Sequence, residues 1–304
     1  MSNLQQRIIT AVVLLAVFIP TLYVSAPWPF LLLTLLMMGA AGWEWSRLIG
    51  WAGWRAWASG VLCWVCALCL YVLLVIIPEA MSDGLELIPQ SAAQLVYGSV
   101  VCLFWIIGGA WLLRRGVARW SALPRWLRWG IGMAMLSLAW VALAAAYALG
   151  VNFLLSVLAL VWAADIGAYT VGRALGGKLT GGRKLAPAIS PGKSWEGALG
   201  GFIGVLAVGA IWIECERHWG FASASLYKML WQRGPIWFLA GLALLTAMSI
   251  VGDLTESLVK RAAGAKDSSQ LLPGHGGVLD RIDALLPTLP LALTLTAFAS
   301  RVVS

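Results

Sequence analysis

Charged residues are scarce in this 304-residue chain: Asp, Glu, Lys and Arg make up 11% of it, and it holds two histidines. Soluble globular chains carry about 25% charged residues, so the composition excludes an ordinary soluble domain. Hydrophobic residues account for 61% of the chain. This enrichment also excludes an intrinsically disordered protein, which has too few apolar residues to bury.

Long apolar runs are present instead. A helix needs roughly 20 apolar residues to cross the hydrocarbon core of a bilayer. By this criterion we expect about nine transmembrane helices, near residues 8–24, 30–48, 57–77, 92–113, 130–148, 151–171, 197–213, 235–251 and 285–303. We therefore predict an all-α polytopic integral membrane protein. Its N-terminal transmembrane helices occupy residues 1–150, and a C-terminal catalytic region occupies residues 151–304.

The net charge of +8 would suggest a nucleic-acid partner in a soluble protein. Here Lys and Arg lie in alternate loops between apolar runs, so they indicate topology, because such loops remain in the cytoplasm. We expect no nucleic-acid partner and a cytoplasmic N-terminus. The acidic loop with Glu79, Asp83 and Glu86 is expected outside. The two longest polar loops, 172–196 and 252–283, are expected on the cytoplasmic side, where they can meet.

The CxxCxxC spacing of Cys63, Cys66 and Cys69 can indicate a metal or iron–sulfur site. These residues lie in an apolar run with no fourth ligand nearby. We therefore interpret them as small hydrophobic residues of a transmembrane helix.

The six aspartates are concentrated near the C-terminus, with four of them between residues 253 and 283. Carboxylates near hydrocarbon are costly and are therefore candidates for function. In VGDLTESLVKR, four polar residues have the spacing of one helix face, if the preceding span continues. These are Asp253, Glu256, Ser257 and Lys260. Asp280 and Asp283 form a second pair, and Asp165 is a third carboxylate group on the same side. Hard oxygen ligands of this kind suit Mg²⁺.

A glycine-rich turn, PGHGG, lies between the two carboxylate pairs. Glycines let backbone N–H groups approach an anion closely, and cationic residues flank the turn. We predict a phosphate-binding loop that includes Gly276 and Gly277. His275 could bind a metal, donate to a phosphate or titrate. The flanking cations are Lys260, Arg261, Lys266 and Arg281.

The other cytoplasmic loop contains ISPGKSWEG, whose Gly-Lys-Ser imitates the end of a Walker A loop. Pro187 stands where the first glycine of that motif should be, and no strand is predicted before it, so we exclude a P-loop NTPase. The segment remains basic and enters a transmembrane helix. We expect phosphate contacts from Lys184, Ser190, Lys193 and Ser194.

Glu44 lies between two tryptophans in GWEWSR. Tryptophans are enriched at the membrane–water interface, so we interpret Glu44 as an interfacial residue. We expect Glu44→Gln to be mild.

No Ser-His-Asp or redox motif is found in the sequence. Phosphoryl or nucleotidyl transfer fits this pattern, because it depends on positioning and on charge neutralisation by metals and cations.

The stretch 257–283 resembles the signature of the phosphatidate cytidylyltransferases, also called CDP-diacylglycerol synthases. The segments VGDLTES, ISPGKSWEG and ADIGAYTVGR are also similar to motifs of this family, although Ile166 replaces the commoner Thr and the link GGKLTGGRKLAP is longer than usual. The matched signature positions are Ser257, Lys260, Arg261, Lys266, Asp267, Pro273, His275, Gly276, Gly277, Asp280, Arg281 and Asp283.

The resemblance implies that CTP and phosphatidic acid react to give CDP-diacylglycerol and pyrophosphate. It implies a Mg²⁺ ion, with a second and monovalent ion such as K⁺. Metal ligands would be Asp253 and Asp280, with Asp283 and Asp165 close by. Catalytic positions would be Lys193, Ser257, Lys260, Arg261, Lys266, Asp267, His275 and Arg281. We expect a homodimer among membrane lipids, in a bacterial cytoplasmic membrane, with the active site facing the cytoplasm.

Two other functions are considered. A CTP-dependent polyisoprenol kinase would transfer the γ-phosphate and release CDP. An ion-coupled transporter also uses intramembrane carboxylates, but it predicts charge at the bilayer midplane and symmetry between halves.

Overall fold

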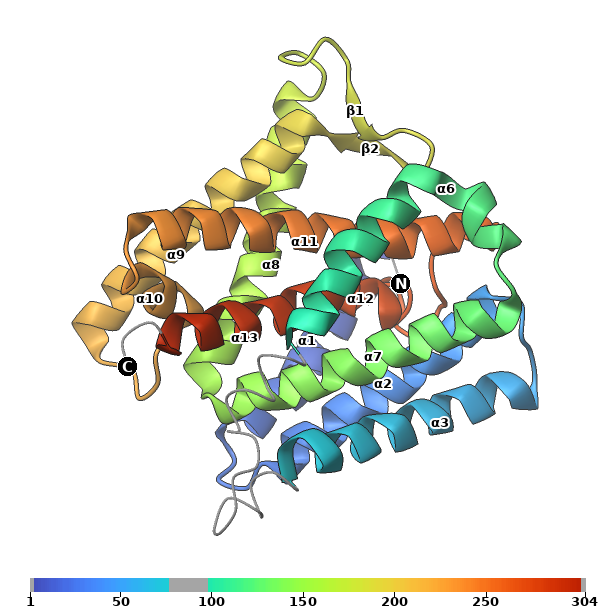
Figure 1. The fold of residues 1–304 in the computed structure, drawn as a ribbon, viewed down its shortest axis with the longest axis horizontal. Coiled ribbons are helices and arrows are strands. Elements are labelled where there is room, and N and C mark those ends of the chain that lie inside the picture. Colours follow the sequence, from blue (N-terminus) through green and yellow to red (C-terminus); the bar gives the residue numbers. More distant parts are fainter. Residues whose placement is uncertain (1–2, 77–97, 302–304) are drawn as a thin grey trace.

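The computed structural model describes residues 3–76 and 98–301, which are almost entirely helical (Figure 1). The helices of the N-terminal half are α1 (Asn3–Tyr23), α2 (Trp28–Leu48), α3 (Trp54–Tyr71) with its π-helical end η1 (Val72–Ile76), η2 (Phe104–Gly109), α6 (Ala110–Ala122) and α7 (Arg125–Ala148). The C-terminal half has α8 (Val151–Leu175), α9 (Trp195–Trp219), α10 (Leu226–Trp231), α11 (Pro235–Ala262), α12 (Leu279–Ile282) and α13 (Leu285–Arg301).

The predicted all-α membrane architecture is confirmed. In the described ranges, eight helices are long and apolar enough to cross a membrane. The expected run 30–48 corresponds to α2, a 21-residue helix that carries Glu44 and Arg47 and is not among those eight. The expected break after Ala148 is present, with Gly150 at a φ of 124° between α7 and α8. The loop with Glu79, Asp83 and Glu86, and residues 92–97, lie outside the described residues.

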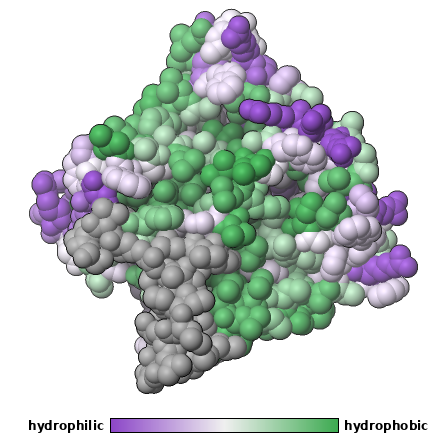
Figure 2. Space-filling model, viewed as in Figure 1, coloured by the Kyte–Doolittle hydropathy of each residue, from purple (hydrophilic) through white to green (hydrophobic). Residues whose placement is uncertain are grey.

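The outer surface of the helices is apolar, as expected for a protein in contact with lipid. Large hydrophobic side chains such as Val12, Leu32 and Ile203 are about half exposed, at 59%, 49% and 56%. Figure 2 shows apolar residues over the middle of the molecule, whereas hydrophilic residues gather at its tip and edges. A soluble protein rarely exposes so large an apolar surface.

The helices α8 and α9 lie side by side (Figure 1) because glycines line their contact. A Cβ atom on Gly167 would lie 2.5 Å from the carbonyl oxygen of Gly200, and one on Gly201 would lie 2.8 Å from that of Ala164. Small residues let membrane helices approach closely. This contact fixes the start of α9 relative to α8.

A short antiparallel hairpin precedes α9 and forms the tip of the molecule in Figure 1. It consists of β1 (Lys184–Ala186) and β2 (Ser190–Ser194), with Lys184 opposite Ser194 and Ala186 opposite Ser190. The basic segment before α9 is therefore ordered as a hairpin.

Candidate active site

One face of α11 carries the polar residues that its sequence spacing predicted. The helix continues to Ala262, well past the apolar run. Ser257 Oγ donates a hydrogen bond to Asp253 Oδ1 over 3.3 Å, from one turn further along. The predicted continuation of the membrane helix into a polar stripe is confirmed.

The two long polar loops, 172–196 and 252–283, meet at this face. Lys193 Nζ, at the end of the hairpin, lies 2.5 Å from Asp253 Oδ2. Arg261 Nε donates to the carbonyl oxygen of Ile189 over 3.2 Å. The Lys193 and Asp253 side chains remain 26% and 32% exposed, so a ligand entering from solvent can reach both charges.

Lys260 lies between two carboxylates and is largely buried. Its Nζ atom is 2.5 Å from Glu256 Oε2 and 2.6 Å from Asp280 Oδ1. The side chain of Lys260 is 13% exposed, and those of Glu256 and Asp280 are 2% and 7% exposed. The positive charge of Lys260 is therefore already balanced by the protein.

Asp280 is the most extensively hydrogen-bonded of the predicted metal ligands. Besides the contact with Lys260, its Oδ2 atom accepts hydrogen bonds from the Ser268 backbone N–H (3.0 Å), the Ser268 hydroxyl (2.9 Å) and the Gly277 backbone N–H (2.7 Å). Both carboxylate oxygens are engaged by protein donors. In this arrangement, Asp280 organises the loop around it.

The other three predicted ligands form an acidic group. Asp253 repels both Asp165 and Asp283 electrostatically, and Lys193 attracts both of them. Asp283 Oδ1 also accepts a hydrogen bond from the backbone N–H of Ala284 over 2.7 Å. Across residues 3–76 and 98–301, no three His, Cys, Asp or Glu side chains converge closely enough to form a metal centre. The donor chemistry nevertheless fits Mg²⁺, because mutually repelling carboxylate oxygens favour a bound cation.

The PGHGG turn is closed by its own backbone. The Leu272 N–H donates to the carbonyl oxygen of Gly276, and the His275 N–H donates to that of Leu272, both over 2.8 Å. Gly276 has a φ of 83°, a conformation that favours glycine. The Gly277 N–H points at Asp280, so phosphate binding by Gly276 and Gly277 stays a prediction.

His275 and Arg281 are joined through the backbone of the turn. Arg281 Nε donates to the carbonyl oxygen of His275 over 3.1 Å. The Nδ1 atom of His275 is buried and has no hydrogen-bond partner. Lys266 and Asp267 lie exposed in the segment between α11 and the turn.

The substrate contacts expected from the hairpin stay predictions. Lys184 is exposed on β1, and Ser190 is partly buried on β2. Ser194 is 3% exposed and caps α9, because its hydroxyl accepts a hydrogen bond from the Gly197 N–H over 3.1 Å. Serine is a preferred helix N-cap, which accounts for this residue without a substrate.

The interpretation of Glu44 as an interfacial residue is wrong. Glu44 is fully buried, with 0% of its surface exposed. Its carboxylate accepts hydrogen bonds from the hydroxyl of Ser269 and from the backbone N–H groups of Val278 and Leu279, and the Oγ atom of Ser268 lies 3.2 Å away. A carboxylate inside an apolar run was the signal that could have identified it.

Glu196 is a second acidic residue that sequence reasoning did not single out. It is 2% exposed in the first turn of α9. Its Oε1 atom accepts hydrogen bonds from the Thr180 N–H (2.9 Å), the Thr180 hydroxyl (2.7 Å) and the Leu179 N–H (3.2 Å). Glu196 therefore holds the long link between α8 and the hairpin.

An apolar groove of about 860 Å³ opens beside the hairpin, between α6, α9 and α11. Its lining reaches Leu254, next to Asp253 in the sequence, and Ile189, next to Ser190. The groove thus connects the apolar surface with the charged site. Other residues that line it include Arg114, Trp195, Phe202 and Ala247.

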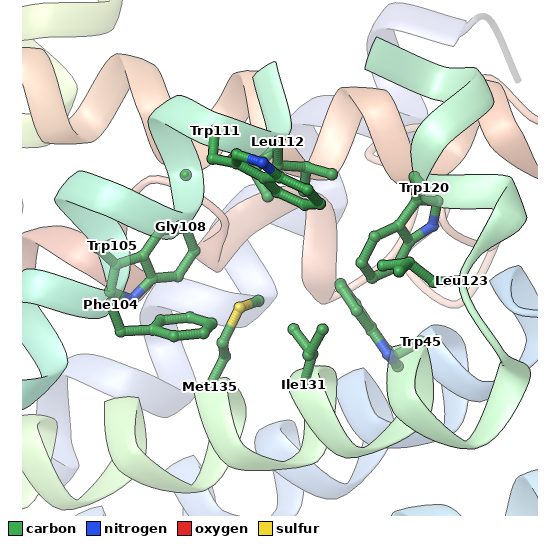
Figure 3. Close-up of a pocket in the computed structure, with 12 residues that line it drawn as sticks. Trp45, Phe104, Trp105, Gly108, Trp111, Leu112, Trp120, Leu123, Ile131 and Met135 are labelled. Atoms are coloured by element: carbon green, nitrogen blue, oxygen red, sulfur yellow. The ribbon is translucent and has the colours of Figure 1, made fainter. Parts of the chain in front are cut away.

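A smaller cavity of about 140 Å³ is lined by residues of α2, η2, α6, α7 and α11 (Figure 3). Aromatic side chains from η2, α6 and α2 surround it, with Met135 and Ile131 of α7 on one side. Thr255 of α11 also lines the cavity, and its hydroxyl has no hydrogen-bond partner. Trp45, the neighbour of Glu44, stands at one end of this cavity.

Comparison with known proteins identifies the family of this chain. Residues 5–299 match the model of the cytidylyltransferase family. The chain is 38% identical over 291 residues to phosphatidate cytidylyltransferase of Pseudomonas aeruginosa, with 94% of each chain covered. It is 35% identical over 303 residues to the enzyme of the same name from Brucella suis, with 94% of this chain and 90% of the relative covered. The chain belongs to the cytidylyltransferase family.

Proposed function

We propose that this multi-pass membrane protein transfers CMP from CTP to phosphatidic acid. A phosphate oxygen of the lipid attacks the α-phosphorus of CTP, and the bond between the α-phosphorus and the bridging oxygen to the β-phosphate breaks. The products are CDP-diacylglycerol and pyrophosphate. Family membership and the charged cluster beside an apolar groove support this proposal.

The lipid phosphate is already an anion, so it needs little help from a general base. The site must instead hold two phosphates of like charge close together and stabilise the leaving pyrophosphate. Lys193 and Arg281 offer cationic groups with exposed surface for this purpose. Lys260 is already neutralised by two carboxylates, so it acts by positioning Asp280.

Asp253, with Asp283 or Asp165, would hold Mg²⁺ together with waters and substrate phosphates, and the ion would supply charge neutralisation for the leaving pyrophosphate. A second, monovalent cation such as K⁺ is part of the same proposal. Its support is the resemblance of residues 257–283 to the cytidylyltransferase signature. Asp280 is a weaker candidate for direct ligation, because its oxygens accept several protein hydrogen bonds.

The apolar groove is proposed to receive the acyl chains of phosphatidic acid. Its apolar lining suits alkyl chains, whereas Arg114 provides a cation for an anionic headgroup. Such a groove lets the headgroup reach Asp253 and Lys193 while the chains stay in an apolar environment.

We also infer a bacterial cytoplasmic membrane location with the site on the cytoplasmic face, because CTP comes from the cytosol. Alternating cationic loops support this orientation. A homodimer is part of the proposal, and native mass spectrometry of the detergent-solubilised protein tests it.

Pyrophosphate release by the purified protein, with CTP in the presence or absence of phosphatidic acid and Mg²⁺, tests the function. Asp253→Asn serves as the control, since the amide removes the charge that pairs with Lys193 while keeping the side-chain volume. We expect release that requires lipid, metal and Asp253. Release of CDP instead of pyrophosphate would favour a lipid kinase, and full activity of Asp253→Asn would remove this residue from the site.

A further inference from the structure

We propose that Glu44 is a positioning residue for the signature loop, defined here as residues 267–283. From the N-terminal half of the chain, Glu44 fixes the backbone that presents Asp280, Arg281 and Asp283. This inference rests on the proposed cytidylyl transfer. It assigns a role to the N-terminal half of the chain, which lies outside the signature of residues 257–283.

Both oxygens of the Glu44 carboxylate accept hydrogen bonds from the signature loop. Oε1 accepts from Ser269 Oγ (2.6 Å) and the Val278 N–H (3.0 Å), and Oε2 accepts from the Leu279 N–H (2.7 Å) and lies 3.2 Å from Ser268 Oγ. Hydrogen bonds to an ionised acceptor are roughly twice as strong as neutral ones. Because Glu44 is fully buried, water does not compete for these donors.

The network continues from Glu44 to Asp280. Ser268 Oγ lies 2.9 Å from Asp280 Oδ2 as well, and the Ser268 N–H donates to the same oxygen over 3.0 Å. Asp280 in turn contacts Lys260 of α11. A shift of Glu44 is therefore transmitted through Ser268 to the first carboxylate of the DRID motif and to the polar face of α11.

Gly277 is needed for the close approach of Glu44 to the loop. A Cβ atom at this position would lie 2.5 Å from Glu44 Oε1 and 2.0 Å from Ser268 Oγ. Both distances are shorter than real Cβ contacts. The glycine of the His-Gly-Gly triplet thus provides room for a protein carboxylate.

Trp45 holds α2 in the orientation that directs Glu44 at the loop. Successive helical residues point about 100° apart, so Trp45 faces a different neighbour. It is 1% exposed, its Nε1 donates to the carbonyl oxygen of Arg128 over 3.0 Å, and its ring packs edge-on against Trp120. Figure 3 shows the two rings together at the end of the aromatic cavity. The rotation of α2 is therefore fixed by α7 and α6.

The helix α1 adds a second contact from the N-terminal half. Arg7 Nε donates to the carbonyl oxygen of Gly274 over 3.0 Å, and Thr10 Oγ1 donates to that of Pro273 over 2.9 Å. Both contacts are exposed, unlike those of Glu44. Glu44 is thus the buried anchor of the signature loop, and α1 covers the turn from outside.

Glu44→Gln in the full-length protein tests this inference. The amide keeps the volume but turns an NH₂ group towards at least one of the donors that now bind an oxygen. We expect kcat to fall about 10- to 100-fold, as for a displaced catalytic group, with a smaller change in KM for CTP. Hydrogen–deuterium exchange should rise in peptides covering residues 267–283 and stay unchanged in α8 and α9.

Glu216→Gln is the matched control. Glu216 is 2% exposed, so it is nearly as buried as Glu44, and it accepts hydrogen bonds from the backbone N–H and the hydroxyl of Ser225, between α9 and α10. Its Oε1 atom also lies 3.6 Å from Lys228 Nζ. We expect this variant to lose thermal stability while keeping turnover and the exchange of residues 267–283.

Wild-type kcat and exchange in Glu44→Gln would overturn the inference, as would equal losses of kcat in both variants. A wild-type protein without pyrophosphate release would instead overturn the proposed function, whereas the exchange measurement would still test the anchoring of the loop.

Discussion

Replacement of Lys260 by Met should destabilise the protein strongly. Lys260 is 13% exposed and lies within 2.6 Å of an oxygen of both Glu256 and Asp280. Methionine fills a similar volume without charge, so both buried carboxylates would lose their counter-charge. Removal of one partner from a buried ion pair typically costs about 3–5 kcal/mol.

The expected loss converts into a measurable shift in thermal unfolding. A change of 1 kcal/mol shifts Tm by about 2–4 °C in chains of 150–250 residues, so Lys260→Met should lower Tm by on the order of 10 °C. Tryptophan fluorescence of the detergent-solubilised protein can follow unfolding, because the chain contains 19 tryptophans.

Two further variants separate the ion pair from other effects of the substitution. Lys266→Met makes the same chemical change at an exposed position and should alter stability by no more than about 0.5 kcal/mol. The double variant Lys260→Met with Glu256→Gln should recover part of the lost Tm, since it removes one of the two unpaired charges.

A single variant within about 1 kcal/mol of the wild type would refute the reasoning. It would mean that Glu256 and Asp280 do not depend on Lys260 for charge balance. A double variant less stable than the single one would show that Glu256 is stabilised by groups other than Lys260.

Two predictions concern the turn and the groove. Gly277→Ala should reduce turnover at least tenfold, because the added Cβ would overlap Glu44 and Ser268. Gly192→Ala is the control, since a Cβ at that position meets nothing within 4 Å. Equal turnover in the two variants would contradict the predicted overlap at Gly277. Ala247→Trp should raise KM for long-chain phosphatidic acid severalfold without changing KM for CTP, because it narrows the groove. Ala240→Trp, on the same helix outside the groove, should leave both KM values unchanged, and a matching rise there would argue against the groove as the lipid site.

The architecture and the polar face of α11 could be predicted from sequence because both depend on local pattern. Apolar runs of helical length predict transmembrane helices, and the spacing of Asp253, Ser257 and Lys260 predicts a shared face wherever the helix continues. The contact between the two polar loops could also be predicted, because the distribution of Lys and Arg places both loops on the same side of the membrane. Lys193 and Asp253 meet as that reasoning requires.

The hydrogen-bond partners of these residues could not be predicted in this way. The sequence suggested Asp280 as a metal ligand and the N–H of Gly277 as a phosphate donor, whereas in the structure they bind each other. Helical periodicity does not describe such a turn, because its hydrogen bonds depend on φ values of 75° and 83° at Gly274 and Gly276.

By itself, the sequence determined that this chain crosses a membrane many times and that its charge is concentrated in one stretch near the C-terminus. Only the tertiary structure decided which buried residue of the N-terminal half anchors that stretch. Glu44 and Leu279 are 235 residues apart in sequence, and the contact depends on the rotation of α2, which Trp45 fixes against α7 and α6. Packing between distant helices sets that rotation, and no local pattern encodes it.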